Sequence, residues 1–560
     1  MSESLSLTTR MRSRILCGVA ALALGTALQP AFAEDAHYGG TMKLVAVASE
    51  GTLDPHINYT AKYWPLFIWT HDGLMAFKKA GGAASAEVVP DLAEEAPVIS
   101  NDGKTYTFKL RQGIKFSNGK DLTVEDVVAS FQRIFKVSSP TSGSFYNGIV
   151  GADKCLADAA TCTLEGGVTG DAATNTITIN LTAPDAEFLY KLAVPHAAIV
   201  PADTVTKDAG NEPIPGTGTY AFESYDPNAS LIMVRNPYFQ EWSAEAQPKG
   251  YADRIEYTFG GTEEAAVNAI LNGQADFMYE PVPSDRLAEL SVSNPDQLRV
   301  SPQVAWWYAP MNVNIAPFNS LEARQALNYA VDRDALVSVF GGPALASPVC
   351  TILPPDMPGH VDRCDYTADP GEFWSAPDMD KALELVEASG TRGQKVTVVT
   401  DDSVTSRGVG TYLQTVLTDL GYDATVQSIS GDIQFTYIQN TNNNVQISVT
   451  QWYQDYPAPS NFLNVLFGCD SFTPGSDSSV NMSGICDKGL DDRMKAAMAL
   501  GSTDPEAALK EWGDIDYDMM KLSPAIPMFT PKDVDLISAR LGNYEFSSQF
   551  HWLVGKSWVQ

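Results

Sequence analysis

The chain has 560 residues, 44% of them hydrophobic, and a formal net charge of −31 at pH 7. Such an acidic chain is unsuited to nucleic acid or anionic lipid, because both are bound through basic patches. A single hydrophobic core stops growing beyond about 250–300 residues, so the length predicts at least two domains.

The first 33 residues have the pattern of a cleaved secretory leader. Arginines precede an apolar run at residues 15–28, and residues 31–33 read Ala-Phe-Ala, a small-x-small cleavage pattern. The run of about fourteen residues is too short for a membrane span, which needs about twenty. Cys17 opens this run instead of ending it, which disfavours a lipoprotein. We therefore expect cleavage after Ala33 and a soluble exported chain.

The next elements are strands and turns followed by a well-marked helix. Residues 42–48 are predicted as a strand that leads into a turn at residues 50–55, and residues 104–111 alternate as a second strand. Thr123 is the predicted N-cap of a helix, with Asp126 three residues on. One face of this helix is apolar: Val124, Val127, Val128, Phe131, Ile134 and Phe135.

One block of the sequence, residues 90–135, is far longer than a short motif. Residues 90–135 read PDLAEEAPVISNDGKTYTFKLRQGIKFSNGKDLTVEDVVASFQRIF. They closely resemble the signature of the family 5 bacterial solute-binding proteins, which feed peptides, nickel or oligosaccharides to ATP-binding-cassette (ABC) importers. The resemblance implies an α/β fold of the two-lobed periplasmic binding protein type, large and cluster C-like, with mixed sheets flanked by helices and an extra subdomain in the first lobe.

The resemblance also divides the chain into parts. It implies lobe I at residues 34–300 with a subdomain at about 78–208, lobe II at residues 301–525, and a return segment into lobe I at residues 526–560. It further implies a monomeric periplasmic receptor that takes a small ligand to an inner-membrane ABC permease and performs no covalent chemistry.

Beyond residue 135 the chain alternates strands and helices. Strands are expected at residues 176–181, 220–224, 231–235, 275–279, 395–400, 423–429 and 446–452. Helices are expected at residues 263–272, 320–331 and 378–388, and between the strands at 395–400 and 423–429. Alternation with short connections predicts mixed or parallel sheets flanked by helices.

Cysteine usage favours an oxidising compartment. Outside the leader the cysteines fall into three local pairs, Cys155 and Cys162, Cys350 and Cys364, and Cys469 and Cys486. Local pairing is the simplest of the possible connectivities, and disulfides suit an exported chain. Metal binding is the competing interpretation, but the 6 histidines are scattered and no CxxC spacing occurs. We expect three disulfides and no metal site.

Catalytic and cofactor motifs are absent from the sequence. Residues 216–221 formally match the dinucleotide pattern GxGxxA, but prolines precede the match and β-favouring residues follow it, whereas the motif needs a strand before and a helix after. The chain contains no HExxH, GxSxG or GxxxxGK[ST]. We expect no cofactor and no enzymatic activity, and keep a secreted hydrolase on a similar scaffold as the alternative class.

The first candidate ligand site is residues 451–459, which read QWYQDYPAP. They follow a strand, and in open sheets binding residues lie at the carboxyl ends of strands. The stretch resembles the block of dipeptide- and oligopeptide-binding relatives whose acidic residue holds the ligand α-amino group. The resemblance therefore implies that Asp455 binds an amine through a charge-assisted hydrogen bond, with Trp452 and Tyr453 beside it. The alternative is that Asp455 only caps the proline turn.

The second candidate site is Trp306, Trp307 and Tyr308, where relatives cross between lobes. Consecutive side chains on a strand point to opposite faces, so we expect at least one in the core and at least one toward a cleft. Glu50 and Thr52, in the turn after the first strand, are further candidates by analogy with the family. Aromatic walls bind peptide side chains and stack on sugar rings equally well.

The ligand class therefore stays open at this point. A short peptide leads, and an oligosaccharide or an opine-like conjugate comes next. A nickel–chelator complex is disfavoured by the scattered histidines. Trp64 and Trp69 are expected in the core.

Overall fold

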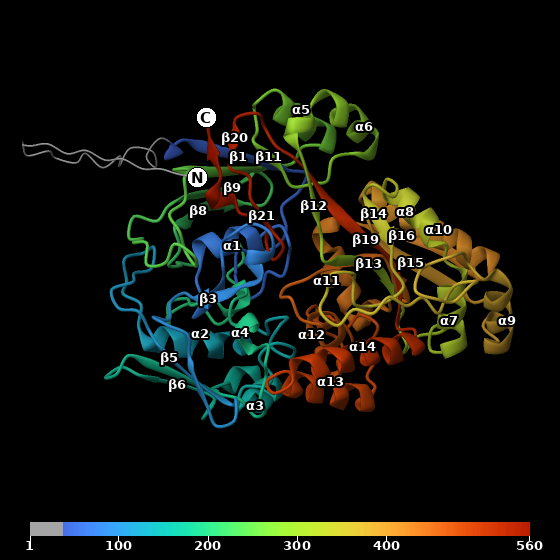
Figure 1. The fold of residues 1–560 in the computed structure, drawn as a ribbon, viewed down its shortest axis with the longest axis horizontal. Coiled ribbons are helices and arrows are strands. Elements are labelled where there is room, and N and C mark those ends of the chain that lie inside the picture. Colours follow the sequence, from blue (N-terminus) through green and yellow to red (C-terminus); the bar gives the residue numbers. More distant parts are fainter. Residues whose placement is uncertain (1–36) are drawn as a thin grey trace, which may run out of the picture. The chain divides into compact units, whose positions relative to one another are not determined.

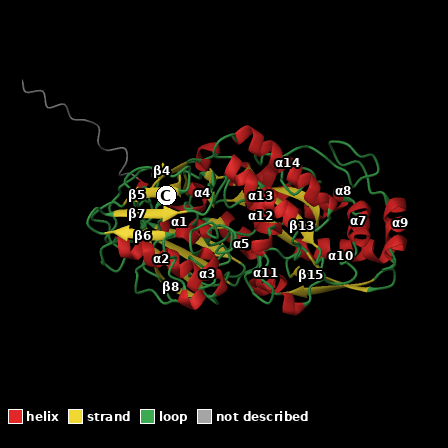
Figure 2. Cartoon of the chain, turned by 90° about the horizontal axis from the view of Figure 1, so that it is seen from below, coloured by secondary structure: helices red, strands yellow, loops and turns green. Residues whose placement is uncertain are grey.

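The computed structural model describes residues 37–560 (Figure 1, Figure 2). The predicted leader at residues 1–33 and its cleavage after Ala33 lie outside the described residues and stay predictions. Within the described part of the chain no helix is long and apolar enough to cross a membrane.

The amino-terminal region, elements β1 to β11 with α1 to α6, is built on a five-stranded sheet. Its order is β11 (Phe277–Met278), β1 (Thr41–Ala46), β10 (Arg254–Phe259), β9 (Ser230–Arg235) and β8 (Tyr220–Asp226). Strand β1 pairs in parallel with β10 and β11, whereas β9 pairs antiparallel with β10 and β8. The sheet is therefore mixed, as predicted, and the buried helix α1 (Trp64–Thr70) packs against β8.

A second, four-stranded sheet lies in the same region. Its order is β4 (Val98–Ser100), β5 (Thr105–Lys109), β7 (Thr176–Asn180) and β6 (Val168–Asp171). Helix α2 (Val124–Lys136) packs on β6 and β7. It begins with a capping box, in which the Thr123 side chain accepts from the Asp126 backbone N–H and the Asp126 side chain accepts from the Thr123 backbone N–H. The predicted N-cap is confirmed.

The region also contains smaller elements. They are β2 (Met75–Phe77), β3 (Val88–Pro90), α3 (Ala152–Ala157), α4 (Phe188–Lys191), α5 (Glu263–Leu271) and α6 (Ser284–Ser293). The predicted strand at residues 275–279 is shortened to β11.

The carboxy-terminal region, elements β13 to β18 with α7 to α14, contains two sheets. The first runs β12 (Leu298–Pro302), β19 (Ala525–Leu536), β13 (Ala305–Pro310) and β18 (Thr450–Tyr453), with β14 (Ala346–Pro348) also on β19. The second runs β16 (Asp423–Ile429), β15 (Lys395–Asp401) and β17 (Ile447–Ser448). The predicted strand at residues 446–452 is thus two strands, because β17 pairs with β15 while β18 pairs with β13.

Helices surround these sheets. They are α7 (Leu321–Ala330), α8 (Arg333–Phe340), α9 (Met379–Ser389), α10 (Val404–Asp419), α11 (Gly431–Gln439), α12 (Ser460–Phe467), α13 (Lys488–Leu500) and α14 (Pro505–Lys521). The predicted β–α–β unit is formed by β15, α10 and β16, whose strands pair in parallel.

Strand β19 contacts both regions, because it pairs with β13 of the carboxy-terminal region and also packs against β11 of the amino-terminal region. Its first half pairs with β13 and its second half with β12, and Figure 1 shows β12 and β19 side by side where the chain passes between the regions. After it the chain rejoins the amino-terminal region through β20 (Leu541–Gly542), β21 (Phe546–Ser547), β22 (His551–Trp552) and β23 (Trp558–Val559). The lobe boundaries at residues 300 and 525 stay predictions.

Cysteine pairing and two core assignments are confirmed. The sulfur–sulfur distances are 2.08 Å for Cys155–Cys162, 1.99 Å for Cys350–Cys364 and 2.13 Å for Cys469–Cys486. Trp64 and Trp69 are buried, as expected.

Candidate functional site

Asp455 lies in the loop between β18 and α12, and two side chains hold its carboxylate. Its Oδ2 atom accepts hydrogen bonds from the hydroxyl of Tyr59 at 2.5 Å and from Nδ2 of Asn461 at 2.6 Å. Asn461 in turn accepts from the backbone N–H of Asp455 at 2.8 Å. Asn461 therefore fixes the carboxylate from its own region, whereas Tyr59 reaches it from the amino-terminal region.

The electrostatic setting of Asp455 is unusual for a carboxylate. The residue is 7% exposed. Burial raises the pKa of Asp455 to about 7, and the hydrogen bonds from Tyr59 and Asn461 only partly oppose this. Among the described residues no cation forms an ion pair with it, and the hydrogen bonds found leave its Oδ1 atom without a donor. A largely buried carboxylate without a counter-ion favours a ligand with a positive charge.

Aromatic side chains surround Tyr59. Its ring stacks on Trp64 with centroids 5.2 Å apart and contacts His196 at 4.9 Å. It meets the edges of Phe145 at 6.3 Å and Trp452 at 5.4 Å. Of these, Trp452 alone comes from the carboxy-terminal region, on strand β18. Tyr59 therefore touches both the Asp455 carboxylate and the Trp452 ring of the carboxy-terminal region, which is the first member of an aromatic wall.

Trp306 and Tyr308 continue the aromatic wall next to Trp452. Trp306 lies opposite Trp452 in the β13–β18 pairing, so the two side chains share a face of the sheet. The rings of Trp306 and Tyr308 are parallel with centroids 4.3 Å apart. Both side chains are buried, and their contact with a ligand stays a prediction.

Trp307 lies on the other face of β13. Its ring stacks on Phe529 at 5.5 Å and contacts Phe340 at 5.9 Å, inside the core of the carboxy-terminal region. The alternation expected of three consecutive strand residues is therefore present. Hydrophobic core side chains surround Trp307, and its contact with a ligand stays a prediction.

Glu50 and Tyr453 belong to a second polar cluster. Glu50 pairs with the buried Nζ of Lys62 at 3.2 Å, and the same Nζ lies 3.5 Å from Glu280 and 4.8 Å from the centre of the Tyr279 ring. Burial, together with the charges of Asp533 and Glu50, raises the pKa of Tyr453. Glu50 and Tyr453 thus interact electrostatically, and no hydrogen bond or ion pair among the described residues joins either side chain to the carboxylate of Asp455.

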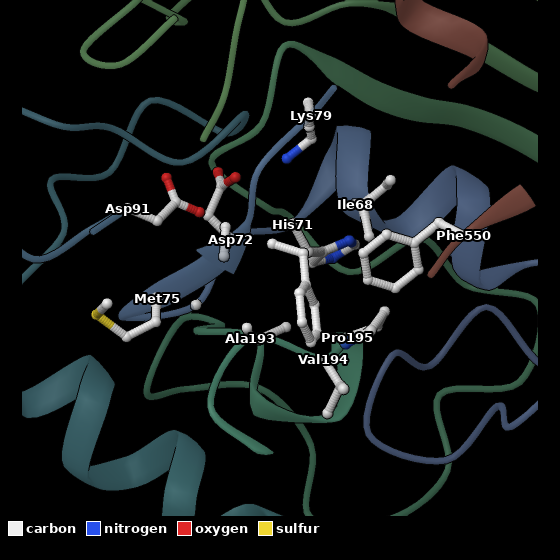
Figure 3. A pocket seen from close by; sticks show the side chains of 14 residues that line it. Ile68, His71, Asp72, Met75, Lys79, Asp91, Ala193, Val194, Pro195 and Phe550 are labelled. Carbon is white, nitrogen blue, oxygen red and sulfur yellow. The ribbon is translucent and has the colours of Figure 1, made fainter. Parts of the chain in front are cut away.

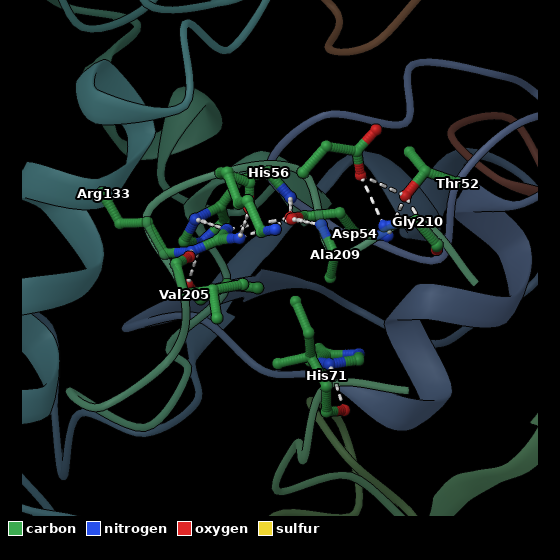
Figure 4. A network of polar contacts seen from close by, with 12 residues as sticks. Thr52, Asp54, His56, His71, Arg133, Val205, Ala209 and Gly210 are labelled. Atoms are coloured by element: carbon green, nitrogen blue, oxygen red, sulfur yellow. Dashed lines mark hydrogen bonds and ion pairs between the residues drawn. The ribbon is translucent and has the colours of Figure 1, made fainter. Parts of the chain in front are cut away.

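Thr52 is tied to a loop of its own region (Figure 4). Its hydroxyl donates to Oδ1 of Asp208 at 2.6 Å and to the backbone oxygen of Gly210 at 2.9 Å. It also accepts from the backbone N–H of Asp54 at 3.1 Å. These bonds anchor the turn after β1, and a role of Thr52 in ligand binding stays a prediction.

The same view shows a buried charge pair beside Thr52 (Figure 4). Arg133, from α2, donates from its two terminal nitrogens to the two oxygens of Asp54, at 2.8 and 2.5 Å. Arg133 also donates to Nδ1 of His56, whose Nε2–H donates to the backbone oxygen of Ala198 at 2.8 Å. This tautomer is neutral, and burial lowers the pKa of His56 to about 4.

A small cavity lies elsewhere in the amino-terminal region (Figure 3). Its volume is about 20 Å³, and Asp72, Lys79 and Asp91 are among its lining residues. Figure 3 shows the two carboxylates side by side, and burial together with the charge of Asp72 raises the pKa of Asp91 well above its usual range. A cavity of this size holds about one water molecule, so it is no site for a peptide.

Sequence reasoning missed two residues of the site. Asn461 follows Asp455 by six residues in the first turn of α12, so a search of the following helix start for amides would have found it. Tyr59 is 396 residues from Asp455 in the sequence, and no local pattern connects them.

The sequence of the chain matches a known protein family. The sequence profile described as "Bacterial extracellular solute-binding proteins, family 5 Middle" matches residues 87–474. The glutathione-binding protein GsiB of Salmonella typhi is 26% identical over 469 residues, covering 81% of this chain and 83% of that protein. The dipeptide-binding protein of Escherichia coli K12 is 27% identical over 468 residues, covering 79% of each chain.

A solved structure shows the same fold. The murein tripeptide binding protein MppA of Escherichia coli superposes with a TM-score of 0.78 at 23% identity, covering 93% of this chain and 99% of that chain. The predicted two-lobed α/β binding-protein fold is confirmed, and the assignment of the amino-terminal and carboxy-terminal regions to its two lobes stays a prediction.

Proposed function

The chain belongs to the bacterial extracellular solute-binding proteins of family 5, and from this premise we propose that its solute is a short peptide with a free α-amino group, held between the lobes. Relatives named for glutathione and dipeptide binding support this ligand class. The proposed role is that of a monomeric periplasmic receptor that closes on the peptide and presents it to an ABC permease.

The proposal depends on one observation, the environment of the Asp455 carboxylate. Its carboxylate is buried without a cation, and its Oδ1 atom has no donor among the described residues. An ammonium group neutralises the charge and donates to that oxygen, and hydrogen bonds between ionised groups are roughly twice as strong as neutral ones. Trp452, Trp306 and Tyr308 then form the apolar wall beside the amine, as ligand sites of mostly apolar lining require.

Calorimetry with trialanine and N-acetyl-trialanine tests the proposal. We expect trialanine to bind at pH 8 and the acetylated peptide to bind far more weakly, because acetylation removes the charge that Asp455 accepts. Equal affinity for the two peptides contradicts an amine site. Failure of both to bind, together with a sugar or conjugate released from the purified denatured protein, contradicts the peptide class.

The same samples test the absence of catalysis. We propose that the protein returns its ligand intact, since no step of covalent chemistry is assigned to any residue. Mass spectrometry of trialanine after long incubation should recover the whole tripeptide. Release of dialanine and alanine in proportion to the protein concentration contradicts the receptor role and favours the secreted hydrolase.

A further inference from the structure

Several contacts join the two lobes near Asp455, and one of them ends on the carboxylate itself. The Tyr59 hydroxyl reaches Oδ2 of Asp455 across the lobes at 2.5 Å. Nearby contacts across the lobes bond Ser460 to Glu187 and pack the ring of Tyr456 edge-on to Phe145 at 5.2 Å. None of these other contacts involves the carboxylate.

The ring of Tyr59 packs mainly against the amino-terminal lobe. Trp64, Phe145 and His196, all of that lobe, contact it on several sides. The backbone beside it is held as well, because Nε2 of His196 donates to the backbone oxygen of Asn58 at 3.0 Å. The hydroxyl therefore reaches Asp455 when the lobes are closed and leaves it when they separate.

We propose that Tyr59 is a closure latch, a positioning residue that holds the lobes together by donating to one oxygen of Asp455 while the ligand ammonium takes the other. This inference rests on the proposed function for the ammonium, but the latch itself needs no ligand. In the open form Asp455 loses one of its two side-chain donors and regains water. Closure and amine binding are therefore linked through one carboxylate.

Removal of the hydroxyl from a latch residue has a different effect from its removal from a residue that only packs. A hydrogen bond to a charged group shifts an equilibrium about tenfold or more. Removing the hydroxyl while keeping the ring therefore shifts the balance between closed and open lobes by about tenfold toward the open form. It also disfavours the ionised form of Asp455, since a bond donated to a carboxylate stabilises its charge.

The first test uses the ligand-free protein. Small-angle scattering should show a larger radius of gyration for Tyr59→Phe than for wild type. Tyr220→Phe is the matched control, because its buried hydroxyl donates at 2.9 Å to the backbone oxygen of Ala252 within the amino-terminal lobe. We expect Tyr220→Phe to match wild type. Identical scattering from Tyr59→Phe and wild type overturns the latch, whether both are closed or both are open.

The second test uses trialanine and measures affinity against pH. Tyr59→Phe should bind about tenfold more weakly at pH 8. The pH at which affinity falls on the acid side should move upward by about one unit, because Asp455 then takes its proton more readily. Tyr220→Phe should move neither quantity. A loss of affinity with an unshifted pH profile assigns Tyr59 to packing and overturns its action on the carboxylate.

Other titratable groups near the site are present in both wild type and Tyr59→Phe, so their effects cancel when the two pH profiles are compared. The hydroxyls of Tyr146 and Tyr456 lie near Asp455. Burial lowers the pKa of His196 to about 3, and it raises the pKa of Glu187 to about 7. Glu187 therefore titrates in the same range, but the shift between variant and wild type isolates the effect of the Tyr59 hydroxyl. If wild type fails to bind trialanine and releases a sugar or conjugate on denaturation, the proposed function fails, while scattering still decides the latch.

Discussion

Two buried aspartates of this protein have opposite environments. Asp54 is fully buried and receives both terminal nitrogens of Arg133, whose bonds bring its pKa below the usual range in spite of burial. Asp455 is almost as buried but has only uncharged donors, and burial raises its pKa to about 7. The first charge is neutralised within the fold, whereas the second is left for a partner that the chain does not supply.

The difference separates a structural charge from a functional one. Removing one member of a buried ion pair leaves an uncompensated charge and destabilises the fold. Removing a buried charge that lacks a counter-ion relieves the fold and harms only the binding that the charge serves. The two aspartates should therefore respond to substitution in opposite directions.

The largest effect is expected at Arg133. Arg133→Met leaves the Asp54 carboxylate buried without its cation, so the free energy of unfolding should fall by about 3–5 kcal/mol. Urea unfolding at pH 7 measures this change. Lys510→Met is the control, since Lys510 pairs with the exposed Asp514 and its removal should change the free energy of unfolding little. Equal losses for the two variants would remove the contrast drawn for Asp54.

Ligand affinity should respond most to Asp455. Asp455→Ala should weaken trialanine binding by about 2–5 kcal/mol, because the ligand ammonium is then buried without its partner. Asp455→Asn should recover little of this, since the amide has no charge. N-acetylation of the peptide should weaken binding to wild type strongly and to Asp455→Ala hardly at all. Calorimetry that finds additive losses would show that Asp455 and the amine do not interact.

Stability should change in the opposite sense at the same residue. The raised pKa means that folded Asp455 keeps its proton up to about pH 7, whereas the unfolded chain loses it near pH 4. Its contribution therefore favours folding at low pH and is lost as the pH rises from about 4 to 7. Asp455→Asn removes the cost of ionisation, so ligand-free protein should gain about 1–3 kcal/mol at pH 8 and little at pH 4.

Urea unfolding of both proteins at these two pH values measures the difference. Other titrating groups are common to wild type and variant and cancel. A variant that is less stable than wild type at pH 8 would place Asp455 with Asp54, as a structural charge.

The smallest effect is expected at Thr52. Thr52→Val removes the bonds to the loop at Asp208 and Gly210, which should lower the free energy of unfolding by about 1 kcal/mol. Trialanine affinity should stay within about twofold of wild type, because these bonds lie within one lobe. A large loss of affinity with unchanged stability would instead establish Thr52 as a ligand contact.

Local signals explain which elements could be predicted. The capping box at Thr123 and the β–α–β unit of β15, α10 and β16 depend on residues close in sequence, and both are present. The break between β17 and β18 depends on which sheet each part joins. No pattern within residues 446–453 contains that information.

The candidate site also contains residues that local patterns predict and a residue that they do not. The resemblance of its own short block predicts Asp455 as a site residue, and the aromatic alternation at Trp306 and Trp307 follows from strand geometry. No local pattern predicts Tyr59 as a site residue, because Tyr59 meets Asp455 only after a turn distant in sequence folds against that carboxylate. A single sequence reports such pairs poorly, since periodicity and capping describe neighbours along the chain.

The late return of the chain through β19 has a consequence for biosynthesis. Phe550, Trp552 and Val554 share one hydrophobic cluster with Met42 and Leu44 of β1. A ribosome that has reached residue 525 has therefore made nearly all of the first lobe without the side chains that complete its interior. For a chain predicted to be exported, we expect this arrangement to delay stable folding of the half that is synthesised first until the last residues emerge. Such a delay would favour transport of the polypeptide in an unfolded form.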